Sequence, residues 1–243
     1  MCRMIAVIGD RELQERALRA FHRLGRCGNI CSFMTPGHLD GWGIGAYHKE
    51  DDMPVVTRSP GSVDSEQEEY LRSVADAVQL DSPVAIGHFR KASQGEITVA
   101  NTHPFVDLPW MFCHNGTVKG LDVLGPRPAI EGNSDSEELF QRWRQAPGVD
   151  SVAGWIEWLA TVEQRCQYTS LTSLLTNGRE LVAVRRVGKP FDPKMDPKEF
   201  PGYYTLYHWQ QGKNHAVSSE ILPELGSEWR LLELGENLVL SCR

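Results

Sequence analysis

Basic charge, long apolar runs and compositional bias are all scarce in this chain of 243 residues. Its 25 Lys and Arg stand against 32 Asp and Glu, a formal net charge of −7, whereas nucleic acids and anionic membranes are bound through basic patches. No apolar run approaches the roughly 18 residues of a membrane span. The 22 Gly and 14 Pro fall short of the bias of disordered chains. We therefore expect a globular protein with no nucleic acid and no membrane as partner.

We also expect no secretory leader. The apolar run Met4–Gly9 is short and three charged residues follow it at once, unlike the apolar core of a signal peptide. We therefore expect a cytoplasmic protein whose six cysteines are free thiols. Cys27 and Cys31, with His38 nearby, have the spacing of half a metal site, but no second Cys/His pair stands at ligand spacing. Core or loop cysteines are the better interpretation, so neither a metal nor a cofactor is predicted.

Alternating apolar segments and turns predict a mixed α+β chain. Strands are predicted at residues 2–8, 41–47, 83–90, 111–114, 171–176, 181–187, 203–208, 216–219, 230–234 and 238–240. Helices are predicted around residues 13–24, 71–78, 139–143 and 152–159. We expect one domain over residues 1–243, in which helices cover the sheets.

Three helix ends carry local signals. Capping boxes, in which a Ser side chain caps the helix and a Glu follows three residues later, stand at Ser65-x-x-Glu68 and Ser134-x-x-Glu137. Gly25 is expected to end the first helix, because glycine is favoured just after a helix.

Cys2 is the first candidate for chemistry. Aminopeptidases of the cytosol remove Met1 when the second residue is small, so we expect the mature chain to begin with Cys2. Its thiol then stands beside a free α-amino group, whose usual pKa of about 7.7–8.0 suits a general base at neutral pH. Such a residue is a nucleophile that carries its own base. An accidental cysteine at this position is the alternative interpretation.

Two further candidates lie near the middle of the chain. Arg90 ends a predicted strand and can offer a bidentate fork to a carboxylate, to which Ser93 would add a hydroxyl. His103 follows in an adjoining loop, where a hydrogen bond to a neighbouring loop would hold the pocket in shape. A solvated arginine and a structural histidine are the alternative interpretations.

Asn115-Gly116 follows a predicted strand and has two compatible interpretations. The side-chain N–H of Asn115 and the backbone N–H of Gly116 could form an oxyanion hole. Asn-Gly is also the strongest short hairpin signal, and a tight turn would aim the same two donors.

Asp135 lies in the first turn of a predicted helix. There its charge complements the helix dipole, or it receives an ammonium group. Taken together, Arg90 suits an α-carboxylate, Asp135 an α-ammonium, and Cys2 with Asn115 and Gly116 a reactive carbonyl. That set predicts hydrolysis of a γ-glutamyl amide.

At this point the sequence resembles the class II glutamine amidotransferase domains, a branch of the N-terminal-nucleophile hydrolases. Six stretches carry the resemblance in the right order: Met1–Arg3, Asp40–Gly45, Gly87–Ser93, Asn101–Phe105, Phe112–Thr117 and Ser134–Glu137. The resemblance implies a four-layer αββα sandwich. It also implies that Cys2 attacks the side-chain amide carbon of glutamine, with its own α-amino group moving the proton.

The resemblance assigns further roles. Asn115 and Gly116 would stabilise the oxyanion, and water would resolve a γ-glutamyl thioester. Arg90 with Ser93 would hold the substrate α-carboxylate and Asp135 its α-ammonium. His103 would lie near the glutamine site.

One departure and three functions stay open. Gln94 stands where the sugar-phosphate members usually have His. With 243 residues we expect no ammonia-using second domain of their kind, and the sequence is similar to the stand-alone subgroup with Asp40-Gly41-Trp42-Gly43. Similar chains hydrolyse γ-glutamyl amides of larger molecules, including an ergothioneine-pathway intermediate and γ-glutamyl peptides. The open functions are hydrolysis of glutamine or a γ-glutamyl conjugate, ammonia supply to a separate synthase partner, and a catalytically silent binding or regulatory subunit.

Overall fold

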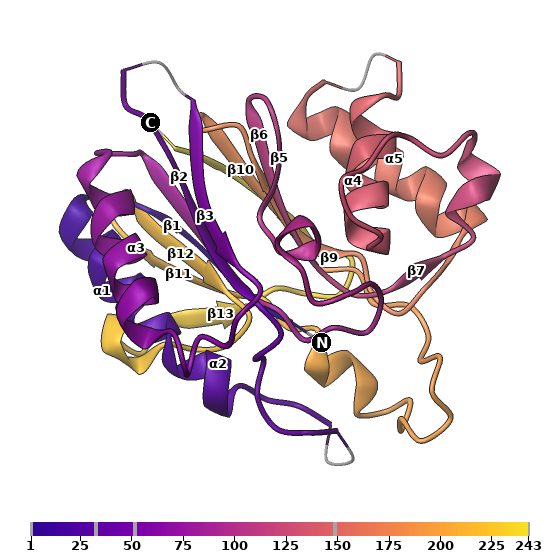
Figure 1. Ribbon diagram of the computed structural model, residues 1–243, viewed down its shortest axis with the longest axis horizontal. Helices are drawn as coiled ribbons and strands as arrows, with labels where there is room; N and C mark the ends of the chain where they lie inside the picture. The colour runs from indigo at the N-terminus through magenta and orange to yellow at the C-terminus, as the bar shows by residue number, and fades with distance from the viewer. Residues whose placement is uncertain (1, 32–33, 51–52, 148–149, 243) are drawn as a thin grey trace.

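A computed structural model describes residues 2–31, 34–50, 53–147 and 150–242. Two large antiparallel sheets lie against each other (Figure 1). The first sheet contains, in spatial order, β13 (Trp229–Leu231), β11 (Tyr207–Gln211), β12 (Asn214–Ser218), β1 (Arg3–Ile8), β4 (Val84–Phe89), β2 (Trp42–Tyr47) and β3 (Pro54–Ser59). The second contains β14 (Asn237–Ser241), β10 (Glu180–Val184), β9 (Thr172–Thr176), β6 (Trp110–Asn115) and β5 (Phe105–Asp107). A small third sheet pairs β7 (Val118–Lys119) with β8 (Gln167–Tyr168).

Helices cover the outer face of each large sheet (Figure 1). The first sheet is covered by α1 (Arg11–Phe21), α2 (Arg23–Cys27) and α3 (Gln67–Gln79). The second is covered by α4 (Asp135–Arg144) and α5 (Val152–Arg165). Short 3-10 helices are η1 (Val99–Asn101), η2 (Leu121–Leu124), η3 (Phe200–Tyr203) and η4 (Pro223–Leu225).

The alternation of side chains along β1 explains the layers. Successive residues of a strand point to opposite faces of the sheet. Ile5 and Val7 enter the core beneath α1 and α3, while Met4, Ala6 and Ile8 enter the core between the two sheets. A strand that is buried on both faces has no solvent-facing side, so β1 is apolar at every position after Arg3.

The second sheet repeats the pattern in β6. Phe112 packs beneath α4 and α5, whereas Met111 and Cys113 face the first sheet. Three cores therefore separate four layers, helix, sheet, sheet and helix. The expected α+β fold, a four-layer αββα sandwich, is confirmed.

Of the two predicted capping boxes, one caps its helix in the structure and the other does not. Ser134 does cap α4, because its hydroxyl accepts from the Glu137 N–H at 3.2 Å. Ser65 does not cap α3: its hydroxyl donates to the Ser62 carbonyl, and the helix begins two residues later.

Two other expectations were wrong. Gly25 does not end a helix but lies inside α2, where a Cβ would stand 2.3 Å from the Val63 side chain. Its small size serves close packing rather than termination. The strand predicted at 203–208 begins only at Tyr207, because Phe200–Tyr203 forms η3.

Candidate active site

Two sheets meet at Cys2. The pairing of Arg3 with Phe89 sets β1 beside β4, so Cys2 lies next to the segment that follows β4. There the Lys91 N–H points to the Cys2 Sγ at 3.4 Å. From the other sheet, Asn115 at the end of β6 accepts a hydrogen bond from the Cys2 N at 2.7 Å through its Oδ1. Residues 113 positions apart in sequence thus form the centre of the site.

The two polar atoms of the Asn115 side chain differ in their hydrogen bonding. The side chain is fully buried and its Oδ1 is taken by Cys2. Its Nδ2 has no hydrogen-bond partner among the described residues. A buried donor without a partner is costly in a folded protein, so this N–H is available to hydrogen-bond a bound ligand.

Gly116 lies next to Asn115 in tight quarters. A Cβ there would stand 1.9 Å from the Ser170 carbonyl oxygen, so no side chain fits. Asn115-Gly116 does not connect a hairpin, because β6 pairs with β5 and β9 whereas β7 pairs with β8. The hairpin interpretation was wrong; the dipeptide ends a central strand at the site.

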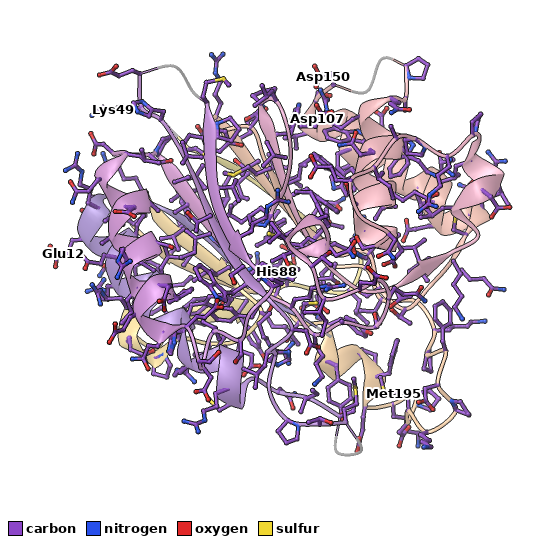
Figure 2. The ribbon with its side chains drawn as sticks, viewed as in Figure 1. Glu12, Lys49, His88, Asp107, Asp150 and Met195 are labelled. Carbon is purple, nitrogen blue, oxygen red and sulfur yellow. The ribbon has the colours of Figure 1, made fainter. Side chains whose placement is uncertain are left out.

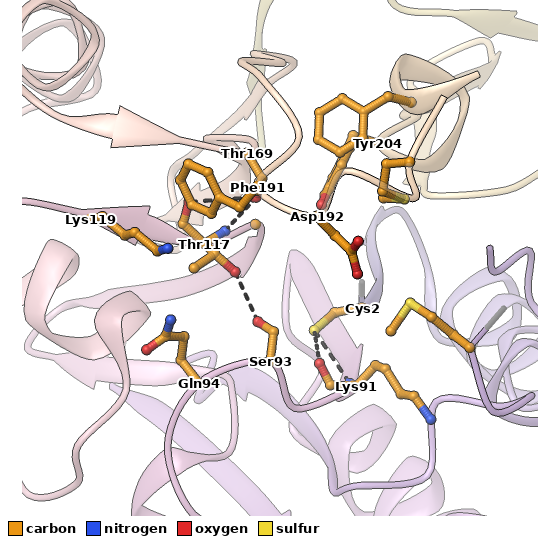
Figure 3. A pocket seen from close by; sticks show the side chains of 14 residues that line it. Cys2, Lys91, Ser93, Gln94, Thr117, Lys119, Thr169, Phe191, Asp192 and Tyr204 are labelled. Carbon is orange, nitrogen blue, oxygen red and sulfur yellow. Dashed lines mark hydrogen bonds between the residues drawn. The ribbon is translucent and has the colours of Figure 1, made fainter. Parts of the chain in front are cut away.

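A cavity of about 350 Å³ opens beside the Cys2 thiol (Figure 3). On one side of it lie Ser93 and Thr117, whose hydroxyls are 2.8 Å apart, with Gln94 and Lys119 beyond them. Met34 and side chains from residues 189–204 also line the cavity: Phe191, Asp192, Met195, Phe200 and Tyr204. In this view Cys2 lies between Asp192 and Lys91, with Ser93 beside it.

Arg90 lies behind the cavity rather than in its lining. Its side chain is buried, and its Nη1 and Nη2 donate to the carbonyls of Glu96 and Gln94 at 2.7 and 2.9 Å. Burial lowers the pKa of Arg90, while the acidic groups Cys2, Asp40 and Asp135 oppose that shift. Arg90 thus shapes the loop that carries Gln94.

Asp135 lies at the start of α4 and faces a neighbouring cavity of about 620 Å³, which shares Gln94 and Lys119 with the first. Its Oδ2 accepts from the Val118 N–H at 2.6 Å. Burial raises the pKa of Asp135 to about 6, against the N–H donors and Arg90, which lower it. This carboxylate can meet a cation in a poorly solvated place.

His103 lies away from both cavities. It is buried, and its ring packs at a tilt against Phe105 and against His88, which lies near the centre of the molecule (Figure 2), with the two histidine ring centroids 4.1 Å apart. Burial keeps its pKa well below the usual value, so the ring is neutral at pH 7. Among the described residues, neither ring nitrogen has a hydrogen-bond partner, so the expected bond to a neighbouring loop is not observed.

Two residues that position the site were not predicted from the sequence. Asn101 Nδ2 donates to the Glu96 carbonyl and to Asn133, and its Oδ1 accepts from the Ser134 N–H. It therefore joins the Gln94 loop to the start of the helix that carries Asp135. Asp40 accepts from the Ala92 N–H at 2.8 Å and fixes the turn before Ser93. Both residues lie in stretches that carried the family resemblance, and that resemblance was the sequence signal that could have identified them.

The wall from residues 189–204 was also missed. Its sequence reads as a proline-rich loop with no motif. In the structure Phe191 lies beneath the Lys119 ammonium, 4.3 Å from the ring centroid, and the Asp192 carboxylate points towards Cys2 (Figure 3). No sequence signal distinguishes such a wall from an ordinary surface loop.

Other ligand classes find no support in the described parts of the chain. No group of three or more His, Cys, Asp or Glu residues there could hold a metal ion. The half-site suggested by Cys27 and Cys31 is split, since Cys27 is exposed and Cys31 packs against Met195. No helix in these parts is long and apolar enough to cross a membrane.

The sequence model of the class II glutamine amidotransferases matches residues 1–188. This protein belongs to that family, and it is an enzyme of the amidotransferase and amidohydrolase type.

Named relatives agree with the family. The Escherichia coli protein YafJ, which bears the family's name, is 28% identical over 246 residues, 84% of this chain and 89% of its own. The gamma-glutamyl-hercynylcysteine sulfoxide hydrolase of Mycobacterium tuberculosis is 31% identical over 147 residues, 60% of this chain and 58% of its own.

A solved structure supports the fold. The glutamine phosphoribosylpyrophosphate amidotransferase of B. subtilis superposes with a TM-score of 0.67 and 20% identity over 99% of this chain. This chain spans 47% of that longer enzyme. At such identity the likeness concerns the N-terminal-nucleophile hydrolase fold alone.

Proposed function

We propose that this enzyme hydrolyses the amide bond of a γ-glutamyl compound through a thioester on Cys2. One observation carries the proposal: the Cys2 N is bonded to Asn115 Oδ1, and the Nδ2 of the same buried side chain has no hydrogen-bond partner among the described residues. Nucleophile, base and oxyanion donor thus converge on one point, which is the arrangement that amide hydrolysis requires.

The reaction follows from these positions. Once Met1, which lies outside the described residues, is removed, the Cys2 N is a free α-amino group and takes the proton of the thiol. The sulfur attacks the amide carbon, and the oxyanion receives hydrogen bonds from Asn115 Nδ2 and the Gly116 N–H. The C–N bond breaks and the amine leaves with the proton. Water, deprotonated by the α-amino group, then cleaves the thioester and releases glutamate.

The γ-glutamyl part fits the side of the cavity with Ser93. Asp135 would hold the α-ammonium, and the loop shaped by Arg90 would hold the α-carboxylate, with Ser93 adding its hydroxyl. His103 supports this region from the core and does not contact substrate.

The leaving group is then directed to the wall formed by residues 189–204. That wall offers Met34, Phe191, Met195 and Tyr204 to whatever departs from the carbonyl. Ammonia needs no such apolar surface, whereas the amine of a conjugate buries against it. We therefore favour a γ-glutamyl conjugate over glutamine as the substrate, and hydrolysis over ammonia supply to a synthase.

Intact-mass spectrometry with the diazo-ketone analogue of glutamine tests the proposal. The initial mass shows whether Met1 is gone, and one adduct mapped to Cys2 is expected. Cys27→Ala, which removes an exposed thiol, should react as the unaltered chain does, while Cys2→Ala should not react.

Each other result has a distinct meaning. A processed chain without adduct contradicts an assembled glutamine site. A retained Met1 contradicts the self-activated cysteine. Hydrolysis of glutamine only when a partner protein is added would favour ammonia supply.

A further inference from the structure

A buried cation directly follows the nucleophile. Arg3 is only 1% exposed and lies inside β1, whose other side chains are apolar. An unpaired charge at such depth would strongly destabilise the fold. Glu220, just after β12, accepts from Arg3 Nε at 2.6 Å and compensates the charge. The catalytic steps proposed above make no use of this pair.

The remaining donors of Arg3 point to the backbone beside the site. Its Nη1 donates to the Cys2 carbonyl oxygen at 2.7 Å, and its Nη2 to the carbonyl of Asn29. The Asn29 N–H in turn donates to Glu220 at 2.5 Å. One guanidinium thus joins the start of β1, the turn after α2 and the turn after β12.

Removal of Met1 makes the contact with the Cys2 carbonyl important. Cys2 then has a single peptide bond, and its amino end is free to rotate. Asn115 fixes the nitrogen and Arg3 fixes the carbonyl oxygen, so the two bonds together set the direction of the amino group and of Sγ. A small misplacement of the reacting atoms lowers the reaction rate far more than it weakens substrate binding.

We propose that Arg3, held by Glu220, is a positioning residue that orients Cys2 for attack. The inference rests on the proposed function, because it concerns the same nucleophile. Neither residue lines the cavity, so their loss changes the reactivity of the thiol and not the binding of the γ-glutamyl group. Glu220 lies beyond residue 188, where the match to the family model ends.

The test measures alkylation of Cys2 by the diazo-ketone analogue of glutamine, as a maximal rate (kinact) and a half-saturating concentration (KI). Arg3→Met should lower kinact about tenfold or more and leave KI within about twofold. Arg3→Lys keeps the charge but not the three-way fork and should fall between. Glu220→Gln should have the smallest effect, because the bond to Cys2 persists. These two milder variants keep the test valid if Arg3→Met does not fold.

Arg144→Met is the matched control. Arg144 is also mostly buried and bonds Asp107 at 3.0 Å and Asp150 at 2.5 Å, on the outer side of the second sheet. Its loss should lower the melting temperature and leave kinact unchanged.

Three results would overturn the inference. If the variants at Arg3 and Glu220 have lower melting temperatures but an unchanged kinact, the pair has only a structural role. A raised KI with unchanged kinact would make Arg3 a binding residue. An unaltered, processed chain that is not alkylated would overturn the proposed function, and this inference with it.

Discussion

The two sides of the Cys2 cavity are built in different ways. On the γ-glutamyl side, Asn115 and Asp135 lie at the ends of regular elements and hydrogen bonds to the backbone hold them. On the leaving-group side, Phe191 and Asp192 stand on a partly exposed segment without strands. The match to the family model ends at residue 188, just before this segment. We infer that the first side carries the shared chemistry and the second adapts it to this enzyme's own substrate.

The largest effect is expected on the γ-glutamyl side. Asn115→Ala should lower kcat by about 10²–10³, because one oxyanion donor is lost. Asn115→Asp keeps an acceptor for Cys2 but has no Nδ2, so it should be at least as slow. The loss should be equal for glutamine and for bulky γ-glutamyl amides. Asn177→Ala, at the turn between β9 and β10, is the control and should keep kcat. A loss of kcat that is confined to bulky substrates would contradict the proposed difference between the two sides of the cavity.

The next effect concerns pH and Asp135. Its pKa of about 6 means that acidification below pH 6 neutralises the carboxylate that would hold the substrate ammonium. We expect kcat/KM for glutamine to fall below pH 6. In Asp135→Asn, kcat/KM should be about 10–100-fold lower and should no longer fall near pH 6. The pH profile of glutaramate, which lacks the α-amino group, is the internal control. A step near pH 6 with glutaramate as well would show that another group titrates.

The γ-glutamyl side also lies over buried neutral histidines. Burial lowers the pKa of His88 to about 3 and of His114 to about 4. In the unfolded chain they take protons near pH 6.5, so their contribution to stability is full above that pH. It is lost as pH falls towards 4, at up to about 1.4 kcal/mol per pH unit for each ring. Asp135, with its raised pKa, opposes this trend between about pH 6 and 4.

Urea unfolding at pH 7.5, 6.0 and 5.0 measures the effect. His114→Gln should lower stability at pH 7.5, because bonds to Ser136 and Ser170 are altered, but should flatten the pH dependence. His48→Gln, at an exposed site, should change neither. Stability that does not change over this range would contradict the buried neutral state.

The smallest effect is expected on the leaving-group side. Asp192 is exposed, so its carboxylate should favour a cationic over an equally long neutral amine by only about three- to tenfold. The ratio of kcat/KM for the γ-glutamyl amides of 1,4-diaminobutane and pentylamine measures this preference, and Asp192→Asn should abolish it. Asp196→Asn is closely matched, since both carboxylates accept from a Lys N–H two residues later at 2.8 Å. If both variants alter the ratio alike, the segment acts as a whole.

Much of the fold followed from local pattern. The apolar runs of β1, β4 and β6 identified central strands because buried strands have no polar face. Capping succeeded at Ser134, where the chain enters α4 directly, and failed at Ser65, where turns intervene before α3. Cys2, Asn115 and Asp135 were proposed as site residues because their chemical groups suit one substrate, and the structure groups them around adjoining cavities.

Other parts depended on contacts between distant segments. The role first given to Arg90 assumed a side chain directed at substrate, whereas its guanidinium donates to the carbonyls of a loop. His103 was expected to hydrogen-bond a neighbouring loop, whereas its ring packs against other rings in the core. Asp192 carries no local signal, and Asn101 had only its place in a stretch that carried the resemblance, because both, like Glu220, act through residues far along the chain.

The sequence by itself suggested the proposed nucleophile, the proposed donor pair and the alternation of apolar strands, because each is a property of neighbouring residues. The tertiary structure decided which backbone groups hold Cys2, how deep Arg3 and Asp135 are buried, and which side chains line the cavity beside Cys2. Burial, pKa and the direction of a side chain arise only when the two sheets and the segment at 189–204 come together, so no stretch of sequence could express them.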